Sequence, residues 1–241
     1  MLKKILFMTG LSLSLLAHGA TPTNVTNEID ADKQARLKAF ADSVIVQYTK
    51  KQDSKFLFAE KPKVNFEVLY FYSNSCPHCY EFDPYVQNWK KQMRDDVSFH
   101  YIPVTFQNNW EVTAKGSLIA KDLKLNNFNN NIYEYIHKKG YRINKMEDLR
   151  DFFSDEYSID TSVFNSLYNS VDINMRIEKY NKITDDFEVD GTPSLVLITK
   201  NKKTYITSPS SAQGPINAIF SLEYLMSNER KEYDKQKEQK N

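Results

Sequence analysis

The residues that decide the fold run from Glu67 to Phe82, Glu-Val-Leu-Tyr-Phe-Tyr-Ser-Asn-Ser-Cys-Pro-His-Cys-Tyr-Glu-Phe. An apolar, aromatic-rich run over residues 66–72 predicts a buried β-strand, and the polar residues 73–75 predict a turn after it. The next four residues are Cys76, Pro77, His78 and Cys79, at the start of a helical pattern whose first turn suits a proline. The chain has no other cysteine. A strand, a turn and Cys-x-x-Cys at a helix start are typical of a redox site.

The spacing of the two cysteines has a chemical reason. Two intervening residues at a helix start bring the sulfurs close enough to form or open a disulfide with little backbone movement. Unpaired N–H groups and the positive end of the helix dipole stabilise the thiolate of Cys76, the form that attacks disulfides and leaves easily. His78 can add a positive charge or a hydrogen bond that lowers the thiol pKa further. We expect Cys76 to be the exposed nucleophile and Cys79 the more buried resolving thiol.

Two other interpretations of the cysteine pair stay open. A structural zinc site needs four ligands, and His100 and His137, the remaining imidazoles outside the first 20 residues, are not at finger-like spacing. A purely structural disulfide would close a loop so short that it hardly constrains the unfolded chain. We therefore favour a redox-active Cys76–Cys79 disulfide, with no metal and no organic cofactor.

Two motifs also carry a family resemblance. Residues 71–82 resemble the active-site segment of the DsbA family of thiol:disulfide oxidoreductases, and residues 189–194, Val-Asp-Gly-Thr-Pro-Ser, resemble the family loop whose proline is cis. In that loop the backbone at Thr192 and Pro193 would hold an extended substrate segment; an ordinary trans proline opening a strand is the alternative. The gap between the motifs is longer than in thioredoxin and largely helical. The resemblance covers roughly residues 60–225 and implies an α/β, thioredoxin-like fold with an inserted helical domain.

The chain departs from the family pattern at one position. Close relatives often carry an acid in the strand, six residues before the first cysteine, where this chain has Tyr70. Asp83, four residues after Cys79, is acidic as in many relatives and can assist proton transfer from Cys79. A solvated helix position is the alternative for Asp83. The redox potential therefore does not carry over from the family.

The first 20 residues have the pattern of a secretory signal peptide, with two lysines, a short apolar run and then small residues. We expect cleavage after Gly19 or Ala20; an uncleaved anchor is the alternative, although the apolar run is short for a membrane span. Cleavage would remove Lys3 and Lys4, so the 32 basic side chains become 30, against 31 acidic ones. That balance does not indicate nucleic acid or a membrane surface as a partner.

We divide the chain into six parts: signal peptide 1–20, N-terminal helical extension 21–63, first thioredoxin-like part 64–107, helical insertion 108–185, second thioredoxin-like part 186–227 and a charged, solvated or frayed tail 228–241. Further strands are predicted at 97–104, 194–199 and 204–207, and a last helix from Pro215. In the extension, Asp30 looks like an N-cap for a helix that reaches Tyr48.

Helical spacing predicts four helices in the insertion, with the polar residues 126–131 as a loop. They begin at Asn108 or Asn109, near Ile132, at Asn144 with Glu147 as its capping partner, and at Asp160. In the last helix, the inward positions expected from the spacing are Phe164, Leu167, Val171 and Met175.

The resemblance implies a periplasmic enzyme that introduces disulfide bonds into reduced, unfolded exported proteins. A quinone-linked membrane reoxidase of the DsbB type would restore its disulfide. We expect a monomer, with a dimer through residues 28–50 as the alternative. Two other functions stay open: a disulfide isomerase or reductase, and a non-catalytic peptide-binding chaperone or adhesin module on the same fold.

Overall fold

The computed structural model describes residues 64–107 and 109–239, together with 35–36, 38–40, 42–43, 46–48 and 55–58. The strands and helices named below belong to the unit Leu37–Asn241. The predicted signal peptide, its cleavage site and the Asp30 cap lie outside the described residues. Among the residues described, no helix is both long enough and apolar enough to cross a membrane.

One five-stranded mixed sheet forms the centre of this unit, in the order β1-β5-β4-β2-β3. The strands are β1 Val46–Tyr48, β2 Phe66–Tyr72, β3 Val97–Pro103, β4 Ser194–Thr199 and β5 Thr204–Thr207. β2 pairs in parallel with β3 and antiparallel with β4, and β4 and β5 form a hairpin. Every side chain of β2 is buried, as a continuous apolar run predicts for a central strand. The strands predicted at 66–72, 194–199 and 204–207 are confirmed.

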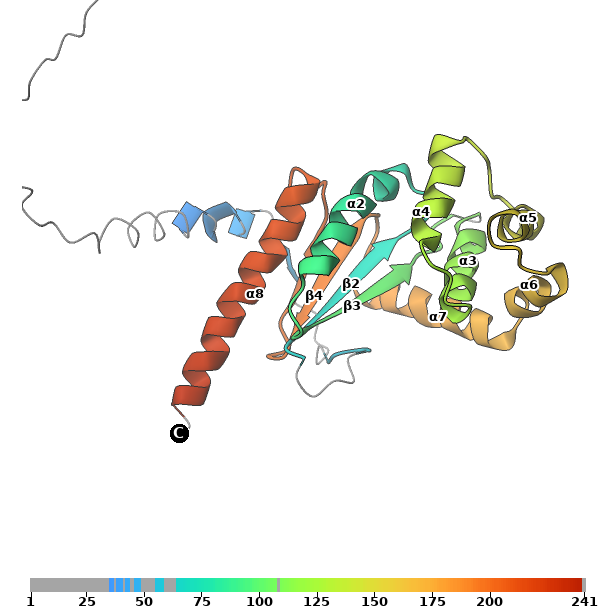
Figure 1. The fold of residues 1–241 in the computed structure, drawn as a ribbon. Helices are drawn as coiled ribbons and strands as arrows, with labels where there is room; N and C mark the ends of the chain where they lie inside the picture. The colour runs from blue at the N-terminus through green and yellow to red at the C-terminus, as the bar shows by residue number, and fades with distance from the viewer. Residues whose placement is uncertain are drawn as a thin grey trace, which may run out of the picture. The chain divides into compact units, whose positions relative to one another are not determined.

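Helices cover both faces of the sheet (Figure 1). Helix α2 (Pro77–Gln92), the crossover between β2 and β3, and helix α8 (Pro215–Glu238) pack on the face formed by alternate β2 residues, Phe66, Val68 and Tyr70. Helix α7 (Val171–Asp186) and the insertion share a second core with the intervening residues Leu69 and Phe71. The insertion lies at the end of the sheet towards which β2 and β3 point, so the turn after β2 lies beside it.

The insertion contains α3 (Trp110–Asp122), α4 (Phe128–Tyr133), the π-helix η1 (Glu134–Lys138), α5 (Met146–Tyr157) and α6 (Thr161–Tyr168), followed by α7. The predicted loop over 126–131 is wrong from Phe128 onward, because α4 begins there. The cap predicted at Asn144 is displaced by one residue. Lys145 is the N-cap of α5, and the Asp148 carboxylate accepts hydrogen bonds from the amides of Asn144 and Lys145, at 2.9 and 3.2 Å.

The single helix predicted from Asp160 is two helices. Asp160 does cap α6, but the hydroxyl of Ser170 accepts a hydrogen bond from the amide of Ile173 at 3.2 Å and starts α7. This break changes the helical phase. Val171 and Met175, predicted to face inward, are therefore 74% and 62% exposed. The N-terminal helix predicted to reach Tyr48 is also too long, because Val46–Tyr48 form β1.

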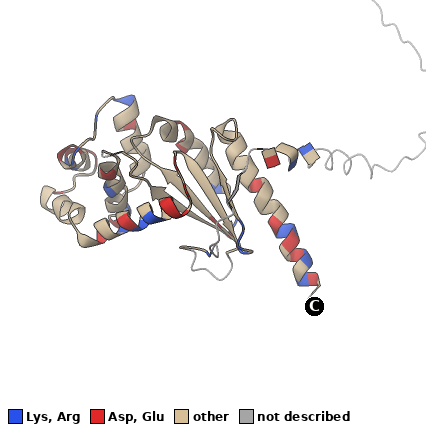
Figure 2. Cartoon of the chain, turned by 180° about the vertical axis from the view of Figure 1, so that it is seen from behind, with Lys and Arg blue, Asp and Glu red and all other residues tan. Residues whose placement is uncertain are grey.

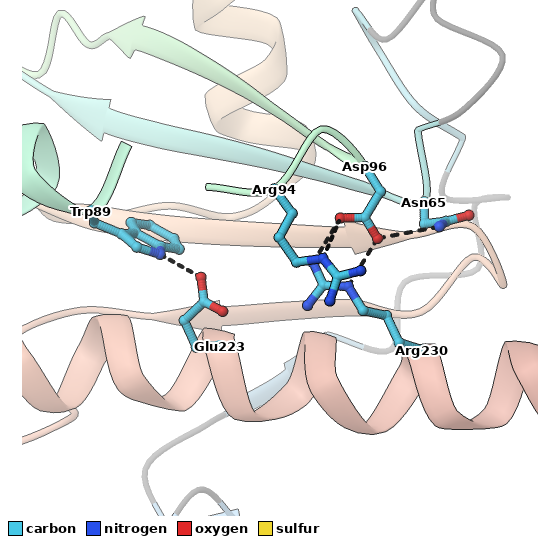
Figure 3. A network of polar contacts seen from close by, with 6 residues as sticks. All are labelled: Asn65, Trp89, Arg94, Asp96, Glu223 and Arg230. Carbon is cyan, nitrogen blue, oxygen red and sulfur yellow. Dashed lines mark hydrogen bonds and ion pairs between the residues drawn. The ribbon is translucent and has the colours of Figure 1, made fainter. Parts of the chain in front are cut away.

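The prediction of a frayed tail from residue 228 is wrong, because α8 continues to Glu238. Arg230 on α8 donates two hydrogen bonds to the Asp96 carboxylate, at 2.9 and 2.8 Å, and Asn65 donates a third at 3.3 Å (Figure 3). Arg94 lies 3.9 Å from the same carboxylate. The loop before β3 is thereby tied to the second half of α8.

Two further contacts hold α8 against the domain. The indole N–H of Trp89 donates to Glu223 at 2.6 Å (Figure 3), and Tyr233 is buried against Phe66. Acidic and basic residues alternate along the C-terminal part of this helix (Figure 2). Because most residues in this part of the chain are charged, the sequence pattern does not show the few residues that face the domain.

Candidate active site

Cys76 lies at the junction of the turn and α2. It is the N-cap residue of α2, in extended conformation with φ −89° and ψ 118°, and Pro77 opens the helix as predicted. The amides of Cys79 and Tyr80 both donate to the Cys76 carbonyl at 3.1 Å, and the Cys76 amide donates to the Ser73 carbonyl at 3.1 Å. The thiol therefore lies at the N-terminus of α2, where it is close to the backbone amides of His78 and Cys79.

The environment gives the two thiols opposite acidities. The pKa of Cys76 is lowered to about 5, chiefly by a hydrogen bond from the Cys79 thiol. Burial opposes the shift, whereas the Thr192 side chain and the amides of Cys79 and His78 add to it. Burial raises the pKa of Cys79, and its contact with Cys76 raises it further. At neutral pH this arrangement holds a thiolate at Cys76 and a protonated thiol at Cys79.

The expectation of an exposed nucleophile needs correction. Cys76 is only 5% exposed and Cys79 is fully buried, so the order is as predicted but both thiols are covered. The Thr192 carbonyl lies 3.7 Å from the Cys76 sulfur. The loop that carries Thr192 covers the thiol, and the predicted cis bond between Thr192 and Pro193 is present.

A cleft of about 600 Å³ opens beside the covered thiol. Its walls include His78 and Phe82 of α2, residues 190–194 of the cis-proline loop and residues 208–210. Within the loop, the hydroxyl of Ser194 donates to the Gly191 carbonyl at 2.8 Å and braces the turn. An extended chain in this cleft would lie against the backbone of the loop.

The His78 backbone lies beside the Cys76 thiol, whereas its ring lies at the surface. The imidazole is 78% exposed, with Nδ1 3.3 Å from Glu81 Oε2 at the surface. The His78 amide is the group that contributes to the low pKa of Cys76.

Asp83 is one helical turn beyond Cys79 and is only 5% exposed, so the solvated alternative is wrong. Burial raises its pKa to about 6, against opposing effects of Gln87 and Lys90. One carboxylate oxygen accepts from Gln87 at 3.3 Å, whereas the other has no hydrogen-bond partner among the residues described. A half-satisfied buried carboxyl with a pKa near neutrality can accept or release a proton.

Tyr70 fills the strand position where the family resemblance led us to look for an acid. It is fully buried, and its hydroxyl has no partner in the described part of the chain. Burial raises its pKa well above the ordinary value, and the nearby charges of Cys79 and Asp83 raise it further. Tyr70 thus lies close enough to both Cys79 and Asp83 to be affected by their charges.

The helical insertion forms hydrogen bonds with the turn that precedes Cys76. The sequence analysis did not identify these contacts. Asn74 is 1% exposed; its side chain accepts from Ser117 at 2.8 Å and donates to Asn129 at 3.3 Å. The His137 imidazole lies 2.8 Å from the Asn74 carbonyl and stacks on Tyr80 at 5.1 Å between ring centroids. His137 belongs to the π-helix η1, and such helices often occur at functional sites. The only sequence signal was the unusual density of asparagine near residue 129.

Comparisons with known proteins agree with this geometry. A family model described as Thioredoxin matches residues 60–213. The thiol:disulfide interchange protein DsbA of Azotobacter vinelandii is 28% identical over 173 residues, 71% of this chain and 78% of that protein. DsbA of Pseudomonas aeruginosa PAO1 is 30% identical over 165 residues, 68% of this chain and 76% of that protein.

The fold agrees as well. The crystal structure of Pseudomonas aeruginosa DsbA superimposes with a TM-score of 0.69 at 27% identity, covering 80% of this chain and 95% of that one. Its fold accounts for both the sheet and the inserted helices. The chain, with its Cys-x-x-Cys pair at the start of α2, therefore belongs to the DsbA family of thiol:disulfide interchange proteins and is a disulfide oxidoreductase of the thioredoxin-like fold.

Proposed function

We propose that this protein is a periplasmic oxidase that introduces disulfide bonds into exported proteins through Cys76 and Cys79. One observation carries the proposal: the pKa of Cys76 is lowered to about 5 while burial raises that of Cys79. A strongly stabilised thiolate favours the reduced form of the pair, so the Cys76–Cys79 disulfide readily oxidises a substrate dithiol. Cys76 is the thiol that faces the substrate, because Cys79 is completely buried.

The reaction has two displacement steps. A substrate thiolate attacks the Cys76 sulfur of the disulfide; the Cys76–Cys79 bond breaks, Cys79 leaves with the electron pair, and a mixed disulfide forms. A second thiolate of the substrate then attacks the substrate sulfur of the mixed disulfide and releases Cys76 as a thiolate. Two electrons pass from the substrate to the protein, and the substrate gains one disulfide.

Asp83 supplies the proton that the buried Cys79 needs when it leaves. The raised pKa of Cys79 means that its thiolate takes up a proton at once, and Asp83, with a pKa of about 6, is a buried donor one helical turn away. The proton returns to Asp83 when the disulfide is formed again.

The cis-proline loop positions the substrate. Thr192 and Pro193 line the cleft beside Cys76, and the Thr192 backbone can pair with an extended substrate segment as a strand would. The substrate cysteine then lies beside the Cys76 sulfur. The protein substrates are reduced and unfolded, and a membrane reoxidase of the DsbB type takes the two electrons from the enzyme, as in the family.

The redox potential tests the oxidase proposal. The purified protein is equilibrated in glutathione buffers and the fraction of Cys76–Cys79 disulfide is measured. A potential near the value of about −120 mV typical of DsbA supports an oxidase, whereas a value near about −270 mV, as in thioredoxin, would refute it in favour of a reductase.

Two variants separate redox chemistry from peptide binding. Cys76→Ser abolishes the oxidation of a reduced substrate, and Cys79→Ser, the matched control, accumulates mixed disulfides through Cys76. A protein that still assists folding equally well as Cys76→Ser would be a peptide-binding chaperone rather than an oxidase.

A further inference from the structure

A second groove, of about 710 Å³, lies between α2, the outer strand β3 and the insertion. Strand β3 is the last strand of the sheet, so one edge of its backbone has no strand partner among the described residues. Residues 99–101 and Pro103 of this strand line the groove. An unpaired strand edge presents N–H and C=O groups that can pair with another extended chain.

The lining of this groove is basic. It contains Lys90 and Lys91 of α2, Lys121 of α3 and Lys124 of the following loop, but only one carboxyl group, the buried Asp83. None of these four lysines forms an ion pair with a carboxylate of the described residues. The protein as a whole has a net charge of only +1. Positive charge is therefore concentrated in the groove relative to the rest of the molecule.

Within the groove, Asp83 interacts with Lys90, whereas two acidic residues of α3 are paired with other cations. Glu111 pairs with Lys115 at 2.9 Å, and Asp122 pairs with Arg176. Burial, with a further contribution from the positive charge of Lys121, lowers the pKa of His100 to about 4, although the Glu67 carboxylate lies 3.5 Å from the same imidazole. Asp83 offsets part of the charge of Lys90, but four lysines against one carboxyl group leave the lining of the groove with a net positive charge.

Aromatic rings form part of the floor. The amino group of Lys90 lies 4.5 Å from the ring centroid of Tyr101 and 5.3 Å from that of Phe99. The Tyr101 hydroxyl accepts a hydrogen bond from Gln87 at 3.1 Å. The floor of the groove thus offers aromatic surface to the side chains of a bound peptide, with the Lys90 amino group and the Tyr101 hydroxyl beside it.

We propose that this groove binds an acidic, extended polypeptide segment, which adds as a sixth strand to the free edge of β3. The seven residues of β3 give the segment its length. The lysines come from three elements spread along the strand, which fits several carboxylates at intervals better than one compact anion. This surface lies on the β3 side of the sheet, whereas the cis-proline cleft adjoins β4.

A competing explanation is that the lysines only protect the edge strand from aggregation, a common use of lysine in β-proteins. The two explanations differ in what they predict for binding. Protection requires no ligand, whereas strand addition requires saturable binding that depends on both charge and backbone N–H groups.

The test uses a seven-residue, cysteine-free peptide of alternating Glu and Thr with an N-terminal fluorescein, titrated with the oxidised protein. Fluorescence anisotropy should show saturable binding that weakens as NaCl rises from about 50 to about 300 mM. The corresponding Lys-Thr peptide should bind at least about tenfold more weakly. Because the probe has no thiol, the result does not depend on the proposed oxidase activity.

Paired charge reversals locate the site. The double substitution Lys121→Glu with Lys124→Glu should lower the affinity for the Glu-Thr peptide at least about tenfold. The matched control, Lys231→Glu with Lys237→Glu on α8, changes the net charge equally and should alter the affinity by less than about twofold. Equal loss in both variants would mean that net charge alone governs the binding, and would overturn the proposal.

Backbone methylation tests strand addition. Peptides N-methylated at every second residue, in the two alternate registers, should differ, with one register losing at least about tenfold in affinity. Full binding by both registers, or no saturable binding below about 1 mM, would overturn strand addition. Aggregation of the Lys121/Lys124 variant without any binding by the parent protein would support edge protection instead.

Discussion

The low pKa of the Cys76 thiol predicts that the reduced protein loses stability in acid relative to the oxidised protein. In the folded reduced state this pKa is about 5, against an ordinary value of 9.0. A depressed pKa stabilises the folded state above the unfolded-state pKa, and this contribution disappears as the pH falls through the folded-state pKa. Only the reduced protein has this contribution, because the disulfide does not titrate.

The magnitude follows from the shift. Each pKa unit corresponds to about 1.4 kcal/mol, so the full contribution is about 5 kcal/mol above pH 9. At pH 7 about half of it, roughly 2.7 kcal/mol, is present, and at pH 4.5 only about 0.2 kcal/mol remains. The reduced protein should therefore lose about 2.5 kcal/mol between pH 7 and pH 4.5 relative to the oxidised protein.

The assay is urea unfolding of the two redox forms at a series of pH values, with the absorbance of the thiolate near 240 nm as a direct titration. The comparison between redox forms matters because Asp83, whose pKa is raised to about 6, changes the stability of both forms in the opposite direction. Subtracting the oxidised curve removes that common contribution.

Two variants sharpen the test. Cys76→Ser has neither the disulfide nor a thiolate at residue 76, so its stability should show the same pH dependence between pH 7 and pH 4.5 as that of the oxidised parent. Cys79→Ala should raise the Cys76 pKa, because the Cys79 thiol makes the largest contribution to lowering it. A measured Cys76 pKa of about 8 or higher would contradict our account of the thiolate, as would a difference between the redox forms that does not vary with pH.

Three further predictions concern the groups around the site and the last helix. The oxidised protein should lose about 2.4 kcal/mol of stability as the pH rises from 4 to 7, because the folded-state pKa of Asp83 is raised, and Asp83→Asn should remove this loss in urea unfolding. His137→Phe keeps an aromatic ring but loses the 2.8 Å hydrogen bond to the Asn74 carbonyl, so thermal unfolding should show a loss of stability of about 1–2 kcal/mol. An unchanged melting temperature would contradict a stabilising role for this hydrogen bond. Arg230→Met should cost about 2 kcal/mol, because it leaves Asp96 without its bidentate partner, whereas the exposed Lys231→Met should cost less than about 0.5 kcal/mol.

The sequence predicted those parts of the fold that follow from local patterns. The central strand over 66–72, the β4–β5 hairpin and the start of α2 at Cys76 are as predicted, because apolar runs, turn residues and a proline in the first turn are local signals. The cis bond at Pro193 was predicted from a motif resemblance, and no local propensity would have indicated it.

Errors arose where a tertiary contact overrides a local pattern. The charged residues after 228 predict a solvated tail, but Arg230 and Tyr233 recur on one face of α8 and pack against distant residues. The apolar spacing from Phe164 to Met175 predicted one continuous helix, but Ser170 caps a new helix within this range. Likewise, nothing in the sequence connects His137 with the carbonyl of Asn74, 63 residues away.

In the proposed mechanism, the acid that exchanges a proton with Cys79 lies on helix α2 rather than on the central strand. The strand position that often holds an acid in the family is Tyr70, which cannot supply a carboxylate. Asp83 follows Cys79 by four residues on α2, and this spacing puts the two on the same face of a helix, one turn apart. Burial by the surrounding aromatic residues then raises the Asp83 pKa to about 6, into the range where a carboxyl group exchanges protons near neutral pH. Because Asp83 and Cys79 lie on the same helix, the helix itself fixes their separation, and the proposed proton transfer does not require an acid at the position of Tyr70.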